Sequence, residues 1–235
     1  IELQDAAGNT TTLNFSVQYD AALAKEQTVF NGERFLPNNM NVFEREDFQV
    51  VTTEKSIYDT VAVVYSAANN NLPGALSLLH NFLSAAIPSH DSVTVRIKPS
   101  VTVPEEWRER IVIKNISGSK TFVEKAIWQK GWVMAKFRQF GSYQALIDNL
   151  PPAINTVATD LSKASRIIFT PTDNFKSIKS FRAELDGHWL RFTNDKGRSW
   201  IYTFDEKFPK GEHELKVRVE DEAGNVTGKI WKVRR

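Results

Sequence analysis

The chain has 235 residues, and its 30 Lys and Arg residues nearly balance its 28 Asp and Glu residues, for a net charge of +2. A charge this even excludes the concentrated positive field that nucleic-acid binding usually needs. The sequence contains no cysteine, which excludes disulfides, thiolate metal sites and cysteine nucleophiles. Hydrophobic residues make up 41% of the chain, as in folded globular proteins, and no segment resembles a membrane span of about 20 apolar residues.

Apolar and polar residues alternate along much of the chain, which is typical of strands in antiparallel sheets. In chain order, the alternating runs lie at residues 13–19, 93–97, 132–137, 200–204 and 215–219. Glycine-containing turn signals separate them, including Ser117-Gly118, Lys130-Gly131, Asp186-Gly187 and Lys210-Gly211. The pattern predicts an all-β chain of tandem antiparallel β-sandwiches.

One segment is ambiguous. Residues 72–86 place Leu76, Leu79 and Leu83 at helical spacing, which predicts a short helix. The strands expected on either side favour an extended edge segment equally well, so both interpretations stand at this point.

The sequence Asp148-Asn149-Leu150-Pro151-Pro152 indicates a domain boundary, because consecutive prolines cannot donate to a sheet ladder and stiffen the chain. A repeated motif gives further organisation: Asp5-Ala-Ala-Gly8-Asn9 and Asp221-Glu-Ala-Gly224-Asn225 each precede a strand-like run. Both predict the last hairpin of a sandwich, with the glycine at positive φ.

We therefore expect three units: the terminal hairpin of a truncated preceding module (residues 1–20), a middle β-sandwich (21–150) and a C-terminal sandwich (151–235). The first unit should form a strand pair or an extended arm, with the apolar residues Leu13, Phe15 and Val17 on one face. We expect that face to dock on the middle domain or on a neighbouring chain, because exposure forfeits roughly 1.5–3 kcal/mol per side chain. The start at Ile1 leads us to expect an excised piece of a longer protein.

Catalytic and metal-binding patterns are missing from the sequence. The four histidines, His80, His90, His188 and His213, form neither H-x-H nor H-E-x-x-H. No G-x-S-x-G elbow or glycine-rich phosphate loop occurs. Asp173-Asn174 and the two repeated loops could offer oxygen ligands to calcium, but each supplies only one or two acidic ligands. We therefore favour turn-stabilising roles for these aspartates and predict no catalytic residue, metal or cofactor.

The remaining candidates for ligand contact are Trp189 and Trp200, which lie in neighbouring predicted strands. An exposed pair of indoles could stack on sugar rings, so the two residues are a candidate glycan platform. Packing in a sandwich core is the competing interpretation, and we prefer it.

Several motifs resemble a known family. The residues 211–225, together with Asp186-Gly-His-Trp-Leu190 and Tyr202-Thr-Phe-Asp-Glu206, resemble the final immunoglobulin-like module of certain bacterial envelope proteins. In those proteins a lysostaphin-type zinc metallopeptidase domain precedes a run of β-sandwich modules. Residues 128–141 and 148–152 are similar to their counterparts there, and residues 5–9 are similar to the end of the preceding module, so the resemblance covers essentially the whole chain.

The resemblance implies a last domain that is immunoglobulin-like and a non-catalytic accessory region of a secreted or periplasmic peptidoglycan-directed endopeptidase. The family's H-x-x-x-D and H-x-H zinc signature is absent here, so no catalytic residue carries over. The implied partner is a catalytic domain upstream of Ile1, with cell-wall glycan or an envelope protein as a further partner. The alternatives are a glycan-binding module acting through Trp189 and Trp200, and an adhesion or assembly module that binds a protein through a sheet edge.

Overall fold

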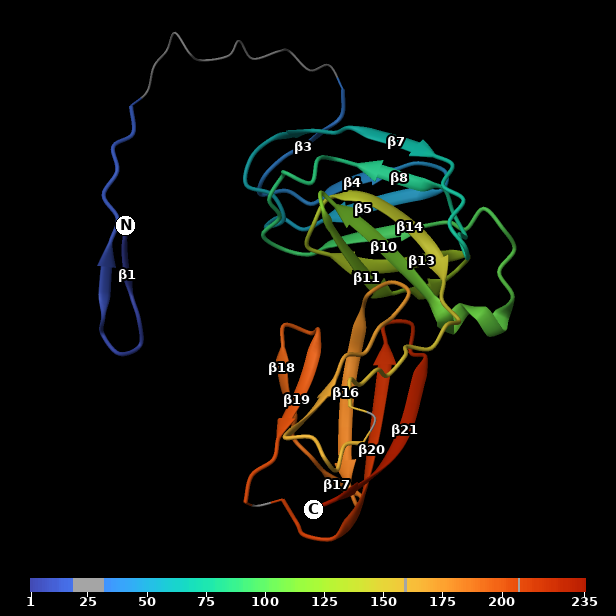
Figure 1. The fold of residues 1–235 in the computed structure, drawn as a ribbon. Coiled ribbons are helices and arrows are strands. Elements are labelled where there is room, and N and C mark those ends of the chain that lie inside the picture. The colour runs from blue at the N-terminus through green and yellow to red at the C-terminus, as the bar shows by residue number, and fades with distance from the viewer. Residues whose placement is uncertain (19–31, 159, 207) are drawn as a thin grey trace. The chain divides into compact units, whose positions relative to one another are not determined.

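The computed structural model describes residues 1–18, 32–158, 160–206 and 208–235. It divides into two compact units, Ile1–Gly32 and Glu33–Arg235. Nearly all of the described elements are strands (Figure 1), which confirms the all-β fold class. Within the described ranges, no helix is long and apolar enough to cross a membrane.

The first unit contains an antiparallel hairpin of β1 (Glu2–Gln4) and β2 (Thr10–Thr12). β2 ends at Thr12, so Leu13, Phe15 and Val17 lie beyond the strand pair, and an extended arm stays the prediction for them. The Leu13 amide still donates to the Ile1 carbonyl at 2.8 Å, but that bond is the end of the ladder. Docking of these apolar residues stays a prediction, and the expected boundary at residue 20 lies outside the described residues.

The second unit begins with a sandwich of two five-stranded antiparallel sheets. One sheet has the order β11-β10-β14-β8-β7 and the other has the order β12-β13-β9-β5-β4. The first comprises β11 (Lys120–Lys125), β10 (Ile111–Ser117), β14 (Gly141–Ile147), β8 (Leu79–Phe82) and β7 (Tyr65–Ala68). The second comprises β12 (Ile127–Gln129), β13 (Trp132–Phe137), β9 (Val93–Ile97), β5 (Phe48–Thr52) and β4 (Asn41–Glu44). A small pair, β3 (Arg34–Phe35) with β6 (Val61–Ala62), and the 3-10 helix η2 (Glu105–Arg110) complete this domain.

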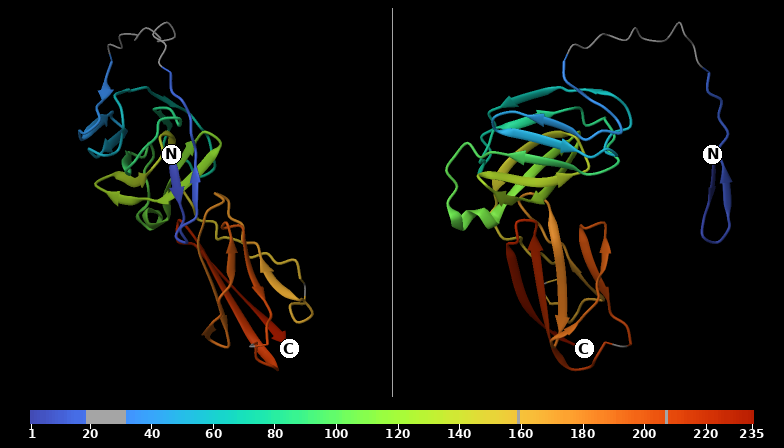
Figure 2. Two further views of the ribbon diagram at one scale, coloured as in Figure 1. Left: turned by 90° about the vertical axis from the view of Figure 1, so that its left-hand side faces the viewer. Right: turned by 180° about the vertical axis from the view of Figure 1, so that it is seen from behind.

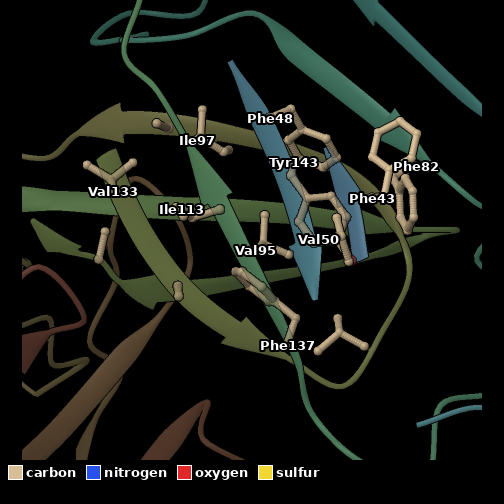
Figure 3. Close-up of a cluster of buried hydrophobic side chains, with 14 of the residues drawn as sticks. Phe43, Phe48, Val50, Phe82, Val95, Ile97, Ile113, Val133, Phe137 and Tyr143 are labelled. Carbon is tan, nitrogen blue, oxygen red and sulfur yellow. The ribbon is translucent and has the colours of Figure 1, made fainter. Parts of the chain in front are cut away.

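Side chains from both sheets meet in one core, as Figure 3 shows. The predicted alternation in β13 is realised, with Val133, Ala135 and Phe137 buried. The ring of Phe48 packs on Phe82 and Tyr143 of the facing sheet, with centroids 5.9 and 6.1 Å apart. Burial of these large rings supplies much of the hydrophobic stabilisation of the domain.

Residues 72–86 contain no helix. Leu79–Phe82 form strand β8, which lies between β14 and β7 rather than at an edge. Its Phe82 is fully buried, and its backbone pairs with both neighbours. Inter-strand bonding on both sides therefore overrides the helical spacing of the leucines, as tertiary context commonly overrides local propensity.

The C-terminal sandwich packs a three-stranded sheet, β15-β19-β18, on a four-stranded sheet, β17-β16-β20-β21 (Figures 1 and 2). The strands of the first are β15 (Arg166–Phe169), β19 (Ser199–Thr203) and β18 (Thr193–Asp195). Those of the second are β17 (His188–Trp189), β16 (Ile178–Leu185), β20 (Glu212–Asp221) and β21 (Val226–Arg234). The alternating residues Leu215, Val217 and Val219 are fully buried in its core. The predicted turn at Asp186-Gly187 has positive φ at both residues, as a tight hairpin turn requires.

Candidate functional site

The candidate site lies at the junction between the two sandwiches, where polar side chains of the described residues are buried together. The continuous apolar run Ile111-Val112-Ile113 at the start of β10 explains its position. Ile111 and Ile113 face the core of the first sandwich, whereas Val112 lies on the outer face and is nevertheless fully buried. Its cover is Ala223, at the tip of the β20–β21 hairpin, which packs in one cluster with Val112, Val123 and Leu146. A strand covered on both faces reads as continuously apolar, as seen here.

Polar contacts fasten this junction. The Nδ2 group of Asn225 donates to the backbone carbonyl of Asp148 at 2.9 Å, and Arg110 Nη1 donates to the carbonyl of Ala223 at 3.4 Å. Asn174 Nδ2 donates to the Asp148 carboxylate at 3.1 Å. Each bond joins the end of the first sandwich, or the Asp148 segment that leaves it, to a loop of the second.

The hairpin tip owes its shape to a local clasp. Asp221 Oδ1 accepts the Asn225 amide at 2.8 Å, Oδ2 accepts Asn225 Nδ2 at 2.9 Å, and Gly224 has a φ of 85°. The first copy of the motif makes the same pair of bonds from Asn9 to Asp5, at 2.9 and 2.8 Å. The sequence repeat therefore encodes a local loop geometry that does not depend on what surrounds it.

The surroundings of the two copies differ sharply. Asp5 and Asn9 are exposed, whereas Asp221 is 1% exposed and Asn225 is 6% exposed. Two further carboxylates approach Asp221: one from Asp148, which is 2% exposed, and one from Asp173. One oxygen atom from each of the three residues lies within 4.8 Å of the others. We call these three residues the junction triad.

The electrostatics of the junction triad are unfavourable as the structure stands. Burial raises the pKa of Asp148, as do, to a smaller extent, the negative charges of Asp221 and Asp173. Burial likewise raises the pKa of Asp173, and Asp221 adds to this effect. None of the ion pairs found among the described residues involves a member of the triad.

One oxygen of the triad also lacks a hydrogen bond. Asp173 Oδ2 accepts the Phe175 amide at 2.8 Å and the Ser177 amide at 3.4 Å, but Asp173 Oδ1 is buried without a partner. Buried carboxylate oxygens are normally satisfied, so an orphan of this kind calls for an explanation. Beside the triad lies an apolar groove of about 460 Å³, lined by Leu72, Pro73 and Phe175 among others.

The structure places the two candidate tryptophans on different sheets of the C-terminal sandwich. Trp189 lies on β17 and is 65% exposed, whereas Trp200 lies on β19 of the other sheet and is 8% exposed. The Trp200 ring stacks on Phe181, with centroids 5.1 Å apart. Trp200 is therefore a core residue, and Trp189 alone presents its ring to solvent. Glycan contact by Trp189 stays a prediction.

The histidines are scattered. His80 is buried in the first sandwich, where its ring stacks on Phe48 and its Nδ1 lies 3.0 Å from the Tyr65 hydroxyl. His213 Nδ1 lies 2.6 Å from Asp186 at the β16–β17 turn. Within the described ranges, the junction triad is the only group of three or more His, Cys, Asp or Glu side chains close enough to share an ion.

The sequence pattern indicated Asp173 and Asp221 as separate possible calcium ligands, and it gave no indication of Asp148. The available signal was the position of Asp148 directly before Asn-Leu-Pro-Pro, where the chain leaves one sandwich and the repeated loop of the next returns to meet it. Only the packing of the two domains brings the three carboxylates together.

Comparison with known proteins agrees with this architecture. Residues 33–148 match the model of the Zu5-like domain family, and residues 163–232 match that of the bacterial Ig-like domain family. No curated protein matches the chain significantly.

Solved structures overlap with the chain at low identity. The fibronectin(III)-like modules of CbhA from Clostridium thermocellum are 13% identical with a TM-score of 0.30, over 73% of this chain and 93% of that one. A polysaccharide lyase is 10% identical with a TM-score of 0.25, over 82% of this chain and 31% of that one. The glycoside hydrolase domain of Endo-D from Streptococcus pneumoniae is 11% identical with a TM-score of 0.22, over 72% and 35%. This chain thus spans about a third of each of the latter two.

The strand topology and the two family matches lead to the same conclusion. The chain is all-β and is built from tandem antiparallel β-sandwiches, the first similar to Zu5-like domains and the second similar to bacterial Ig-like domains.

Proposed function

We propose that this chain is a non-catalytic accessory region of a larger protein of the bacterial envelope, and that it positions a peptidoglycan-directed metalloendopeptidase domain on the cell wall. The observation that carries the positioning role is the fastened junction, in which Asn225, Arg110 and Ala223 tie one sandwich to the next. Contacts of this kind limit the motion of one domain relative to the other beyond what a Pro-Pro linker achieves.

The identity of the catalytic partner rests on the motif resemblance, and the match to a bacterial Ig-like domain is compatible with it. Immunoglobulin-like sandwiches serve many proteins as spacers and binding modules, so the fold alone does not select the enzyme. We infer a secreted or periplasmic location on the same grounds.

Deletion of residues 21–235 from the parent protein tests the accessory role. Cleavage of a small soluble peptide should stay largely intact, because no group in the deleted region takes part in the chemistry. Cleavage of intact cell-wall material, or correct placement in the envelope, should fall. Equal loss of both activities in a folded truncation would mean that the modules complete the active site, and the proposal would be wrong.

A point variant separates the presence of the domains from their coupling. Ala223→Lys places a long charged side chain where Ala223 now packs, fully buried, against Val112 and Leu146. It should lower cell-wall cleavage while leaving soluble-peptide cleavage intact. Ala67→Lys, on the exposed strand β7, is the matched control and should change neither activity. Wild-type activity of Ala223→Lys on cell walls would show that the junction is irrelevant to positioning.

A second candidate function is glycan binding, which the 65% exposure of Trp189 favours. Sedimentation of the chain with insoluble peptidoglycan measures it directly. Trp189→Ala should abolish co-sedimentation if the ring stacks on sugar, whereas Trp107→Ala, at a partly exposed indole on η2, should have no effect. Absence of co-sedimentation in the wild type would eliminate this candidate.

A further inference from the structure

We propose that Asp148, Asp173 and Asp221 bind one calcium ion at the junction between the two sandwiches. The inference deepens the positioning role proposed above, because the ion would regulate the junction. It does not depend on which enzyme the chain accompanies.

The spacing of the junction triad suits a single ion. Calcium binds oxygen ligands at about 2.3–2.6 Å, so two oxygens that share one ion are at most about 5 Å apart. One oxygen from each of the three aspartates lies within 4.8 Å of the other two. Small side-chain shifts therefore suffice to bring all three carboxylates to a single ion.

The orphan oxygen is a second and independent sign of a ligand. Asp173 Oδ1 is buried and accepts no hydrogen bond, although the other oxygen of the same carboxylate accepts two backbone amides. An unsatisfied buried acceptor costs about 1–3 kcal/mol, and more when it is charged. A cation that binds this oxygen removes the cost, whereas the described part of the chain offers no donor for it.

The balance of charge around the junction triad also favours a bound cation. Asp148 and Asp221 are almost fully buried, and no described ion pair involves any of the three carboxylates. Lys114 lines the neighbouring groove but is not part of any of these ion pairs either. Hydrogen-bond donors alone do not neutralise three neighbouring negative charges, so a bound cation offsets the repulsion within the triad.

The donor set selects the metal. Three carboxylates with no imidazole or thiolate are the ligands of a hard cation, and they disfavour zinc. The clasp from Asn225 to Asp221 and the amides that hold Asp173 fix two of the ligands before the ion arrives. Calcium accepts such irregular oxygen sites, whereas magnesium demands near-ideal octahedral geometry at shorter distances.

The position of the triad makes the ion a bridge. Asp148 belongs to the end of the first sandwich, and Asp173 and Asp221 belong to the second. The first copy of the loop motif has the same Asp–Asn clasp at Asp5 but belongs to no group of three potential ligands among the described residues. It therefore serves as a matched control within the same chain.

Calorimetric titration of the chelator-washed chain with calcium chloride tests the proposal. We expect about one equivalent to bind with a dissociation constant of roughly 0.1–1 mM, as in extracellular calcium modules. Magnesium should bind at least about tenfold more weakly. Calcium should also raise the unfolding temperature and slow amide hydrogen exchange at residues 148–150 and 221–225.

Two variants locate the site. Asp173→Asn should weaken calcium binding by about tenfold or more, because it removes a charged ligand while preserving the shape of the side chain. Asp5→Asn should bind calcium as the wild type does. If Asp173→Asn proves unfolded by circular dichroism, Asp148→Asn takes its place, and the comparison of calcium with magnesium on the wild-type chain still applies.

Three results would overturn the proposal: no heat and no thermal shift at about 10 mM calcium, equal binding of calcium and magnesium, or wild-type affinity in the folded Asp173→Asn variant. Each is measured on this chain alone, without the parent enzyme. Failure here would leave the deletion test of the accessory role unaffected, and failure of that test would leave calcium binding intact.

Discussion

Replacing Asn225 with alanine should destabilise the C-terminal sandwich and its junction strongly, whereas the same change at Asn9 should have almost no effect. The Asn225 side chain donates to the Asp221 carboxylate and to the Asp148 carbonyl, both at 2.9 Å, from a position that is 6% exposed. Alanine leaves both acceptors buried without their donor. The two asparagines close the same Asp-x-Ala-Gly-Asn motif, so the comparison tests the effect of burial.

The magnitude follows from the two orphaned acceptors. Each buried acceptor that loses its partner costs about 1–3 kcal/mol, with the charged one at the upper end. Partial access of water and relaxation of the loop reduce the sum, so we expect a loss of about 2–4 kcal/mol for Asn225→Ala. Asn9 donates to Asp5 in solvent, where water replaces the bond, and Asn9→Ala should stay within about 0.5 kcal/mol of the wild type.

Urea unfolding in the presence of a chelator, followed by far-ultraviolet circular dichroism, measures both variants without any contribution from bound metal. A slope of about 1–3 kcal/mol per molar urea converts the expected loss into a midpoint lower by roughly 1 M or more for Asn225→Ala. Similar midpoints for the two variants would refute the reasoning, because they would show that the junction contributes nothing beyond the local clasp.

Three further changes test other parts of the fold by the same unfolding assay. Gly141→Ala should lower the free energy of unfolding by about 3 kcal/mol or more, because φ is 140° and the added Cβ would lie 2.2 Å from a carbonyl oxygen of a neighbouring strand. Gly118→Ala, where the added Cβ meets open space, should lower it by only about 1 kcal/mol. Equal losses for the two variants would contradict the predicted clash. Trp200→Ala should cost about 3–5 kcal/mol as a buried-ring deletion, and a stability close to that of the wild type would show that the ring is not part of the core. The hydrogen bond to Asp186 raises the pKa of His213 in the folded state. The contact between protonated His213 and Asp186 therefore stabilises the fold fully below the unfolded-state pKa of about 6.5, and this stabilisation is lost as the pH rises through the folded-state pKa. The stability difference between the wild type and His213→Gln should therefore be larger at about pH 5.5 than at about pH 8.5, and the reverse order would rule out this contact as its source.

Local features could be predicted from the sequence because neighbouring residues determine them. Alternation along β13 and β20 predicted which side chains enter a core, since successive residues of a strand point to opposite faces. The Asp-x-x-Gly-Asn motif predicted its own hairpin turn in both copies, because the clasp joins residues only four positions apart. The all-β class follows from the same short-range signals.

Other features depend on partners that lie far away in the sequence. The leucines of residues 72–86 are compatible with a helix until β14 and β7 pair with β8 on either side. The alternating apolar residues beyond Thr12 are typical of a strand, yet among the described residues no backbone segment pairs with those after Leu13. Trp189 and Trp200 look equivalent in sequence, and only the packing of two different sheets buries one of them.

The junction triad shows the same division most clearly. The local motif is enough to explain why Asn225 clasps Asp221, just as Asn9 clasps Asp5. It did not determine that Asp148 and Asp173 would stand beside Asp221, because the three residues belong to separate segments and meet only where one sandwich packs on the other. Carboxylates repel one another and have no local preference for such a grouping. Their approach is imposed by the burial of Val112, Leu146 and Ala223, whose apolar contacts set the distance between the domains.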